Sequence, residues 1–316
     1  MLTVRIAAKT AEAQDVCAFD LVHPDGLPLP AFTAGAHVDV HLPNGLIRQY
    51  SLCNSPTERE RYRIAVLKTA DSRGGSACMH DQIQAGDTLD ISTPRNLFAL
   101  SDDTAAPAVL FAGGIGITPV LAMAEHLTGT GQAFSLHYCA RSPDRAAFMQ
   151  QIMTSAYSAC ASHYFDDAGD ELDTAGVLAK AAAGTHLYVC GPAGFMDHVL
   201  QRARDLGWAE SRLHREYFIA TSIDHGSDGA FSIQIAGTGE VIVVPADKTA
   251  LEVLIAKGFD IPMSCEQGIC GTCLTRVVDG IPDHRDQFQT DDEQAQNDQF
   301  TPCCSRSKTP VLVLDL

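Results

Sequence analysis

The chain has 316 residues, of which 46% are hydrophobic and 19% are charged. This length predicts two or three domains, and the composition excludes a disordered chain. The formal net charge of -17 argues against a nucleic-acid binder, because phosphate backbones are bound by positive surfaces. The sequence has no run of about 18 apolar residues and no apolar signal-peptide core, so we expect a soluble, cytoplasmic protein without membrane or nucleic-acid partners.

The first hundred residues are expected to form a small antiparallel β-barrel. Turn sequences such as HPDG and LPNG separate short runs with the composition of strands. These runs lie at residues 16–22, 37–42, 47–52, 61–67 and 87–92. We place this first domain at residues 1–103.

From Pro107 onward, strand and helix patterns alternate. The apolar stretches AVLFAG, FSLHYCA, SHYF and HLYVCG are strand candidates, and TPVLAMAEHL and FMDHVLQRARDLG are helix candidates. Alternation of this kind is typical of parallel βαβ units. We therefore predict an α/β domain with a parallel sheet at residues 104–222.

The remaining residues are expected to form a third domain after a short linker. The small and polar residues at 223–230 indicate the linker. The strand patterns FSIQIA, EVIVVP and VLVLDL and the helix pattern TALEVLIAKG then fall within residues 231–316. This segment also contains the strongest chemical motif of the chain.

That motif is the stretch SCEQGICGTC, in which three cysteines follow the spacing C-x4-C-x2-C. A fourth cysteine, with 29 residues between it and Cys273, completes the set Cys265, Cys270, Cys273 and Cys303. This is the plant-type [2Fe-2S] spacing, in which two thiolates hold each iron. Zinc is the main alternative, although zinc sites usually present two close cysteine pairs.

Two further features of the loop bear on this interpretation. Gly268 and Gly271 suit a backbone that turns tightly around a cluster and directs N–H groups at sulfur. Cys304 is a second candidate for the fourth ligand, but adjacent side chains of an extended segment point in opposite directions, so Cys303 is preferred. The other cysteines are expected to be free buried thiols, because a reducing compartment disfavours disulfides.

Glycine-rich turns at two strand ends are candidates for a nucleotide site. GGIGITP leads from a strand into a helix, where free N–H groups could meet a diphosphate, although a tight connection explains it equally well. CGPAGFM has the same strand–turn–helix design, and Cys190 taken alone is more simply a buried structural thiol.

Two motifs of the first domain are candidates for a flavin site. In RQYSL, Arg48 could pair with a phosphate and Tyr50 could pack against a ring, although a half-buried strand would look the same. In SRGGSACMHD, a glycine pair and a serine precede a helix pattern, which could hold a terminal phosphate.

The motifs RQYSL, RGGS, GGIGITP, CGPAGFM, CEQGICGTC and CSR, in this order, resemble the phthalate dioxygenase reductase family, and within it the reductases of vanillate O-demethylases. The resemblance covers essentially the whole chain. It implies a ferredoxin reductase-type flavin barrel, a nicotinamide-binding α/β domain and a C-terminal α+β, β-grasp ferredoxin domain. It also implies FMN as the flavin and NADH, more than NADPH, as the electron donor.

The resemblance further implies roles for individual residues. Arg48, Tyr50 and Ser51 would hold FMN, and Gly74, Gly75 and Ser76 would surround its phosphate. Gly113, Gly114, Gly116, Thr118 and Pro119 would line the nicotinamide nucleotide site. Cys190, Gly191 and Pro192 would lie near the nicotinamide ring, with Thr118 and Cys190 closest to the hydride-transfer step.

The resemblance implies the reductase component of a two-component Rieske oxygenase of the aromatic O-demethylase type. The three-part build suits this role, because a flavin can take two electrons from NADH and pass them singly to a cluster. The alternatives are a reductase of the same build for a phthalate-type dioxygenase or carnitine-type monooxygenase, or a non-catalytic redox sensor. The choice of nucleotide depends on Arg141, Ser142, Asp144 and Arg145 after one strand, which could favour either NADPH or NADH.

We also expect an acidic rim around the cysteine loop to dock on a basic partner. Glu266, Asp283 and Asp286 are the candidates for this rim. Surface charges of one sign guide association with a partner of the opposite sign.

Overall fold

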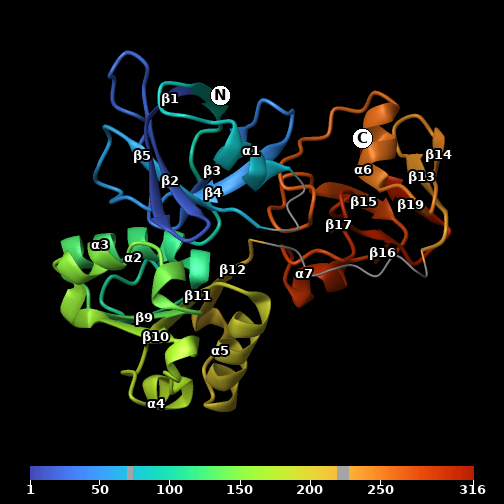
Figure 1. The fold of residues 1–316 in the computed structure, drawn as a ribbon. Helices are drawn as coiled ribbons and strands as arrows, with labels where there is room; N and C mark the ends of the chain where they lie inside the picture. The colour runs from blue at the N-terminus through green and yellow to red at the C-terminus, as the bar shows by residue number, and fades with distance from the viewer. Residues whose placement is uncertain (70–73, 219–227) are drawn as a thin grey trace. The chain divides into compact units, whose positions relative to one another are not determined.

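The computed structural model describes residues 1–69, 74–218 and 228–316. The described chain divides into two compact units, Met1–Glu216 and Tyr217–Leu316, each of which is described by itself (Figure 1). The first unit contains both the barrel and the α/β sheet. Residues 223–227 of the expected linker lie outside the described residues, so the domain boundaries stay a prediction.

The first unit begins with an antiparallel barrel whose strands follow the order β4-β3-β6-β1-β2-β5, with β7 paired to β3. The strands are β1 (Leu2–Ala13), β2 (Val16–Val22), β3 (Ala36–His41), β4 (Ile47–Ser51), β5 (Tyr62–Leu67), β6 (Thr88–Ile91) and β7 (Arg95–Asn96). An isolated bridge between Leu52 and Ile64 joins the two end strands of this order and so closes the barrel. Alternate side chains, including those of Val4, Phe19 and Val38, are fully buried inside it.

The five predicted strands of the barrel are confirmed within one residue at either end, and a short helix, α1 (Gly75–Asp81), follows the glycine pair. The sequence patterns missed β1, because its run of Ala, Lys, Thr and Glu has weak strand propensity. Antiparallel pairing with β2, from Arg5 opposite Val22 to Ala13 opposite Val16, makes this segment a strand.

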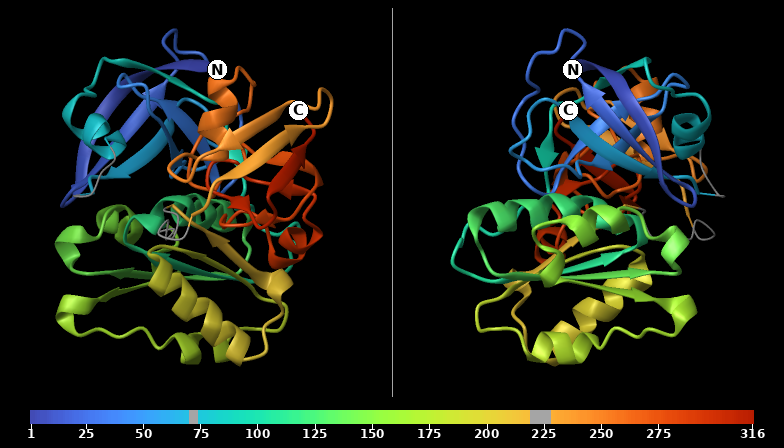
Figure 2. Two further views of the ribbon diagram at one scale, coloured as in Figure 1. Left: turned by 90° about the vertical axis from the view of Figure 1, so that its right-hand side faces the viewer. Right: turned by 60° about the vertical axis from the view of Figure 1, so that its left-hand side comes forward.

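The second part of this unit is a five-stranded parallel sheet with the order β10-β9-β8-β11-β12. Its strands are β8 (Ala108–Gly113), β9 (Phe134–Ala140), β10 (Ala161–Phe165), β11 (His186–Cys190) and β12 (Leu213–Glu216). Helices α2 (Ile117–Thr130) and α3 (Met149–Thr154) cover one face, and α4 (Thr174–Ala179) and α5 (Ala193–Asp205) cover the other (Figure 2). The strand order reverses between β8 and β11, and ligands of such sheets bind at the carboxyl ends of the strands beside this point.

The second unit has a mixed sheet in the order β14-β13-β19-β15-β17, with β13 and β19 parallel. The elements are β13 (Phe231–Ile235), β14 (Val241–Val244), α6 (Ala250–Ala256), β15 (Thr275–Asp279), β16 (Pro282–Asp283), α7 (Asp291–Gln296), β17 (Gln299–Phe300), β18 (Arg306–Ser307) and β19 (Val311–Leu314). A capping box of Thr249 and Glu252 starts α6, whose Leu254 is buried in a core with Phe300 and Leu312.

This unit confirms the expected α+β fold, so the three-part fold class holds as a whole. No helix in the described ranges is long and apolar enough to span a membrane.

Candidate functional site

The loops after β8 and β11 meet so closely that only glycine fits at their contact. A Cβ atom on Gly191 would lie 2.9 Å from the Cα of Gly113, and one on Gly116 would lie 2.3 Å from the carbonyl oxygen of Cys190. Real Cβ atoms do not approach other atoms so closely. The two motifs predicted to line the nucleotide site therefore form one surface at the point where the strand order reverses.

Helix α2 starts directly after this surface. Gly114 has a positive φ of 54°, which lets the chain turn from β8 toward the helix. Thr118 and Pro119 are buried in its first turn, and the Thr118 hydroxyl donates a hydrogen bond of 3.0 Å to the carbonyl of Ile115. The structure thus places both residues beside the glycine loop, while their contact with a cofactor stays a prediction.

A cavity of about 350 Å³ opens beside the same loop. Gly113, Gly114 and Ile115 form one wall, and Pro192 joins them from the loop after β11. Three barrel residues close the cavity from the other side, namely Gln14, Val16 and Leu67. The size and the mixed polar and apolar lining suit part of a dinucleotide.

The charged residues of this cavity come from the ends of β9 and β10. Arg141 and Arg145, both predicted to influence the choice of nucleotide, line it together with Asp166. Ser142 is buried, and the carbonyl of Asp144 accepts a hydrogen bond from the barrel. Sequence reasoning missed Asp166, although its place directly after a strand of a parallel sheet is the signal that could have found it.

The predicted phosphate-binding residues of the barrel also come together. The side chain of Arg48 on β4 lies across Gly75, where a Cβ atom would be 2.6 Å from the arginine Nε. Gly74 has a φ of 95°, and Ser76 follows in the first turn of α1. A guanidinium group beside a glycine turn fits a phosphate. Arg73 of the same motif lies outside the described residues.

The end of β4 carries two of the predicted flavin residues, and one of them, Ser51, contacts the edge of the α/β sheet. Tyr50 packs against the barrel core, and burial raises the pKa of its phenol, which keeps it neutral. Ser51 donates a hydrogen bond of 3.2 Å to Oε2 of Glu216, the last residue of β12.

Glu216 is a candidate site residue that sequence reasoning missed, and it adjoins the predicted residues Ser51 and Cys190. Burial raises its pKa to about 8, while the hydrogen bond from Ser51 opposes this rise. Cys190 pairs with Glu216 across β11 and β12 and is fully buried. Burial, and then the nearby Glu216, raise the pKa of Cys190 well above its usual value, so Cys190 is a neutral thiol rather than a nucleophile.

In the second unit, the four predicted cluster cysteines are buried and lie as two pairs. Cys265 and Cys270 are hydrogen-bonded to each other, and Cys303 is hydrogen-bonded to Cys273 and also to its neighbour Cys304. The bond from Cys265 lowers the pKa of Cys270 to about 5. In the described part of the chain no three metal-binding side chains converge on one ion position. Two pairs of thiols fit a cluster with two irons, each held by two thiolates.

The backbone of the cysteine loop points toward sulfur, as predicted. The N–H of Gln267 donates to Sγ of Cys265 at 3.3 Å, and that of Thr272 donates to Sγ of Cys270 at 3.5 Å. Such bonds stabilise thiolates and influence the potential of a cluster.

The two loop glycines are required by their conformation and by close packing. Gly268 and Gly271 have φ values of 74° and 65°. A Cβ atom on Gly268 would lie 2.4 Å from Sγ of Cys304, and one on Gly271 would lie 2.4 Å from the ring of Phe288. The Cys304 sulfur is thus packed beneath the loop, 3.3 Å from the Thr301 hydroxyl.

The structure contradicts the prediction of the acidic rim at one of its three residues, Asp286. The side chain of Asp286 is fully buried and accepts a hydrogen bond of 2.8 Å from the N–H of Gln289. Asp283 is partly exposed and pairs with Arg285, and only Glu266 is freely exposed. Asp286 therefore supports the loop from inside and cannot contact a partner.

Comparison with known proteins agrees with both parts of the site. Residues 233–308 match the model of the 2Fe-2S iron-sulfur cluster binding domain, and residues 93–213 match that of the dimethylamine monooxygenase subunit DmmA-like N-terminal domain. The vanillate O-demethylase oxidoreductase of Pseudomonas sp. (strain HR199 / DSM 7063) is 55% identical over 318 residues, which is 100% of both chains. The phthalate 4,5-dioxygenase oxygenase reductase subunit of Pseudomonas putida is 43% identical over 99% of this chain and 96% of its own.

A solved structure of phthalate dioxygenase reductase, described as modular for electron transfer from pyridine nucleotides to [2Fe-2S], superposes with a TM-score of 0.78. It is 39% identical and covers 100% of this chain and 98% of its own. The chain belongs to the phthalate dioxygenase reductase family. As a member of this family it is an oxidoreductase of the flavin iron-sulfur class.

Proposed function

We propose that the protein passes electrons from NADH through FMN and a [2Fe-2S] cluster to a Rieske-type terminal oxygenase. The observation that carries this proposal is the combination of sites in one chain. The first unit joins an arginine–glycine phosphate cradle to a nucleotide cavity, and the second holds four buried cysteines in two pairs.

The barrel residues fit a flavin mononucleotide. A flavin supplies the exchange between a two-electron donor and a one-electron acceptor. Arg48 would bind its phosphate beside Gly74, Gly75 and Ser76, where a side chain on Gly75 would collide with the arginine. Tyr50 and Ser51 would flank its ring from β4.

The carboxyl of Glu216, a half-buried residue, would hold a proton next to this site. Because its pKa is raised to about 8, Glu216 is mostly protonated at neutral pH and can donate a hydrogen bond without adding charge. Cys190, equally neutral, would fill the space beside the nicotinamide ring. Both groups exclude water from the place where the hydride is transferred.

The cavity at the strand ends would hold the nucleotide. Arg141 and Arg145 would pair with its phosphates, and Asp166 would accept hydrogen bonds from a ribose. A carboxylate at this position repels a 2′-phosphate, which favours NADH over NADPH. The ratio of kcat/KM for NADH to kcat/KM for NADPH tests this choice. Replacement of Asp166 by alanine should lower this ratio.

The partner follows from the relatives, since one is named for vanillate O-demethylase and another for an oxygenase reductase subunit. We propose that the oxygenase partner carries a Rieske centre and removes a methyl group from a vanillate-like aromatic acid. The expected docking face includes the exposed Glu266 beside the cysteine loop.

Reconstitution tests this proposal directly. The purified protein, NADH and a vanillate-type oxygenase component should release formaldehyde from vanillate, whereas a phthalate-type oxygenase should support much slower turnover. Equal or faster turnover with the phthalate-type oxygenase would overturn the proposed partner. NADH-dependent reduction of cytochrome c separates an active reductase from a redox sensor, because a sensor would not turn over.

A further inference from the structure

Barrel residues contact both ends of segment 144–148, which connects β9 to α3 in the α/β part. The N–H of Gln14 donates a hydrogen bond of 2.7 Å to the carbonyl of Asp144. The guanidinium carbon of Arg63 on β5 lies 5.7 Å from the centre of the Phe148 ring. Because Arg145 lines the nucleotide cavity between these two contacts, the barrel positions one wall of that cavity.

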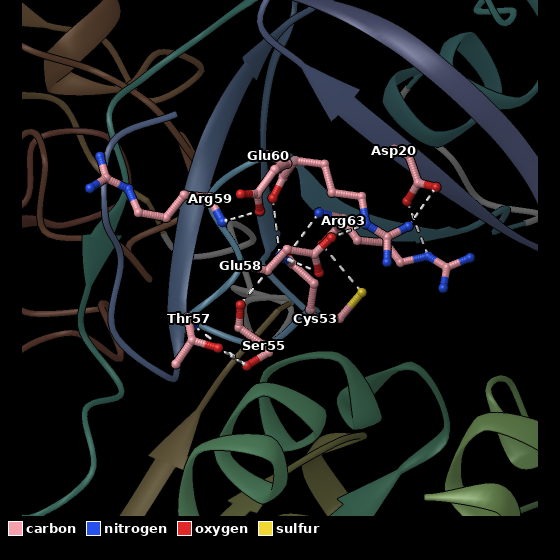
Figure 3. Close-up of polar contacts among 10 residues, drawn as sticks. Asp20, Cys53, Ser55, Thr57, Glu58, Arg59, Glu60 and Arg63 are labelled. Carbon is pink, nitrogen blue, oxygen red and sulfur yellow. Dashed lines mark hydrogen bonds and ion pairs between the residues drawn. The ribbon is translucent and has the colours of Figure 1, made fainter. Parts of the chain in front are cut away.

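Two barrel carboxylates lie next to the Arg63 side chain, and Figure 3 shows one of them, Asp20. Its Nη2 lies 3.0 Å from Oε1 of Glu12 on β1, and its Nε lies 3.3 Å from Oδ1 of Asp20 on β2. The three side chains are between 15% and 19% exposed. Glu12 accepts a hydrogen bond from the guanidinium, whereas the Nε–Asp20 contact is an ion pair without hydrogen-bond geometry. The barrel therefore holds the guanidinium over the Phe148 ring through one hydrogen bond and one charge contact.

The backbone of Arg63 holds the turn that follows β4. Its carbonyl accepts hydrogen bonds from the N–H of Cys53 at 2.8 Å and from the thiol of the same residue at 3.2 Å. Its N–H donates to Oδ1 of Asn54 at 2.9 Å. This turn follows the strand that carries Ser51. The backbone of Arg63 thus contacts the turn, and its side chain contacts Phe148, three residues from the cavity residue Arg145.

Phe148 has an unusual backbone conformation. Its φ of 64° and ψ of 13° place it in the left-handed region, and its side chain is buried at 2% exposure. Bulky residues rarely adopt this conformation, and they keep it only where the surrounding structure imposes it. The contact with Arg63 is thus made by a residue whose ring is held in one position.

We propose that Arg63 is a positioning residue for hydride transfer. It holds segment 144–148, and with it the nucleotide cavity, at a fixed place relative to the end of β4. This inference rests on the proposed transfer from NADH to a flavin on that strand. Loss of the Arg63 side chain lets the cavity wall shift, so the nicotinamide is presented less often in the reactive geometry.

The test compares Arg63→Met with Arg61→Met in the holoprotein. Arg61 pairs with the same Asp20 at 2.8 Å and with Glu58 at 2.6 Å, so its replacement is a matched loss of charge in the same network. Stopped-flow measurement with NADH and 4-deuterated NADH gives the rate of flavin reduction and its isotope effect. We expect Arg63→Met to slow flavin reduction about tenfold or more and to raise KM for NADH, with unchanged flavin content.

Arg61→Met should stay within about twofold of the unmodified protein in the same assay. Phe148→Leu keeps an apolar side chain but removes the aromatic face, so it should also slow flavin reduction. If Arg63→Met fails to fold, this variant tests the positioning role instead. Equal rates for the Arg61 and Arg63 variants, or an unchanged rate in Phe148→Leu, would overturn the inference. If NADH fails to reduce the flavin of the unmodified protein, the proposed function fails instead.

Discussion

Replacement of Glu216 by glutamine should raise stability at neutral and alkaline pH while it impairs turnover. The folded protein raises the pKa of Glu216 from 4.5 to about 8, chiefly through burial. A raised carboxyl pKa means that the folded state favours the protonated form. The stability of the unmodified protein therefore falls as pH rises from the unfolded value toward 8, and glutamine, which never ionises, avoids this loss.

The size of the effect follows from the shift. One pKa unit corresponds to about 1.4 kcal/mol. The shift of Glu216 therefore lowers the free energy of unfolding by about 3 kcal/mol at pH 7 and by roughly 4 to 5 kcal/mol above pH 8. Below pH 5 the two proteins should be almost equally stable. The Ser51 hydroxyl can donate to the glutamine oxygen as it does to the carboxyl, so the variant should keep the local fold.

Urea unfolding at pH 5, 7 and 8.5, followed by fluorescence of Trp208, measures this difference within the first unit. Trp208 is the single tryptophan of the chain and follows α5. Glu210→Gln is the control, because Glu210 is exposed and its bond with Arg204 lowers its pKa. A stability difference for Glu216→Gln that does not grow with pH would refute the reasoning.

The other predictions concern the cluster and the half-buried His214. Cys303→Ala should abolish the visible absorption of the cluster, whereas Cys304→Ala should retain it. The reverse pattern, absorption kept in Cys303→Ala and lost in Cys304→Ala, would make Cys304 the fourth ligand. Gly271→Ala should lower the iron content per chain by more than half, because its Cβ would meet the Phe288 ring at 2.4 Å in a backbone with φ of 65°; full iron content would contradict this. Burial, and then the charge of His186, lower the pKa of His214 to about 4. The neutral His214 ring therefore contributes its full stability to the fold above pH 6.5, and this contribution declines as pH falls toward 4. His214→Phe should flatten this acid decline in unfolding curves at pH 5 and 7, and an unchanged decline would exclude His214 as its source.

Most of the fold could be predicted because apolar periodicity is strong where strands are buried. The patterns at FSLHYCA and VCAFDLV coincide with β9 and β2 residue for residue. Strands β1 and β12 have mixed polar sequences, and they are strands because neighbouring strands supply hydrogen-bond partners. Pairing of that kind is a long-range property, which a local pattern does not contain.

The site residues could be predicted from the sequence where the spacing of cysteines or a glycine-rich turn marks them. Cys265, Cys270, Cys273 and Cys303 follow a ligand spacing, and their pairing in the structure agrees with it. Glu216 has no motif, because its role depends on burial and on Ser51, which lies 165 residues earlier. The error on Asp286 has the same origin, since the sequence shows a charge but not that Gln289 and Ser305 enclose it.

Anaerobic addition of NADH to the purified protein tests the central claim most directly. Visible absorption and electron paramagnetic resonance follow the cluster, and extraction identifies the flavin. The account predicts one FMN per chain and a [2Fe-2S] signal that NADH reduces within the time of turnover. A colourless protein that contains zinc, or a cluster that NADH leaves oxidised while FMN is bound, would contradict it.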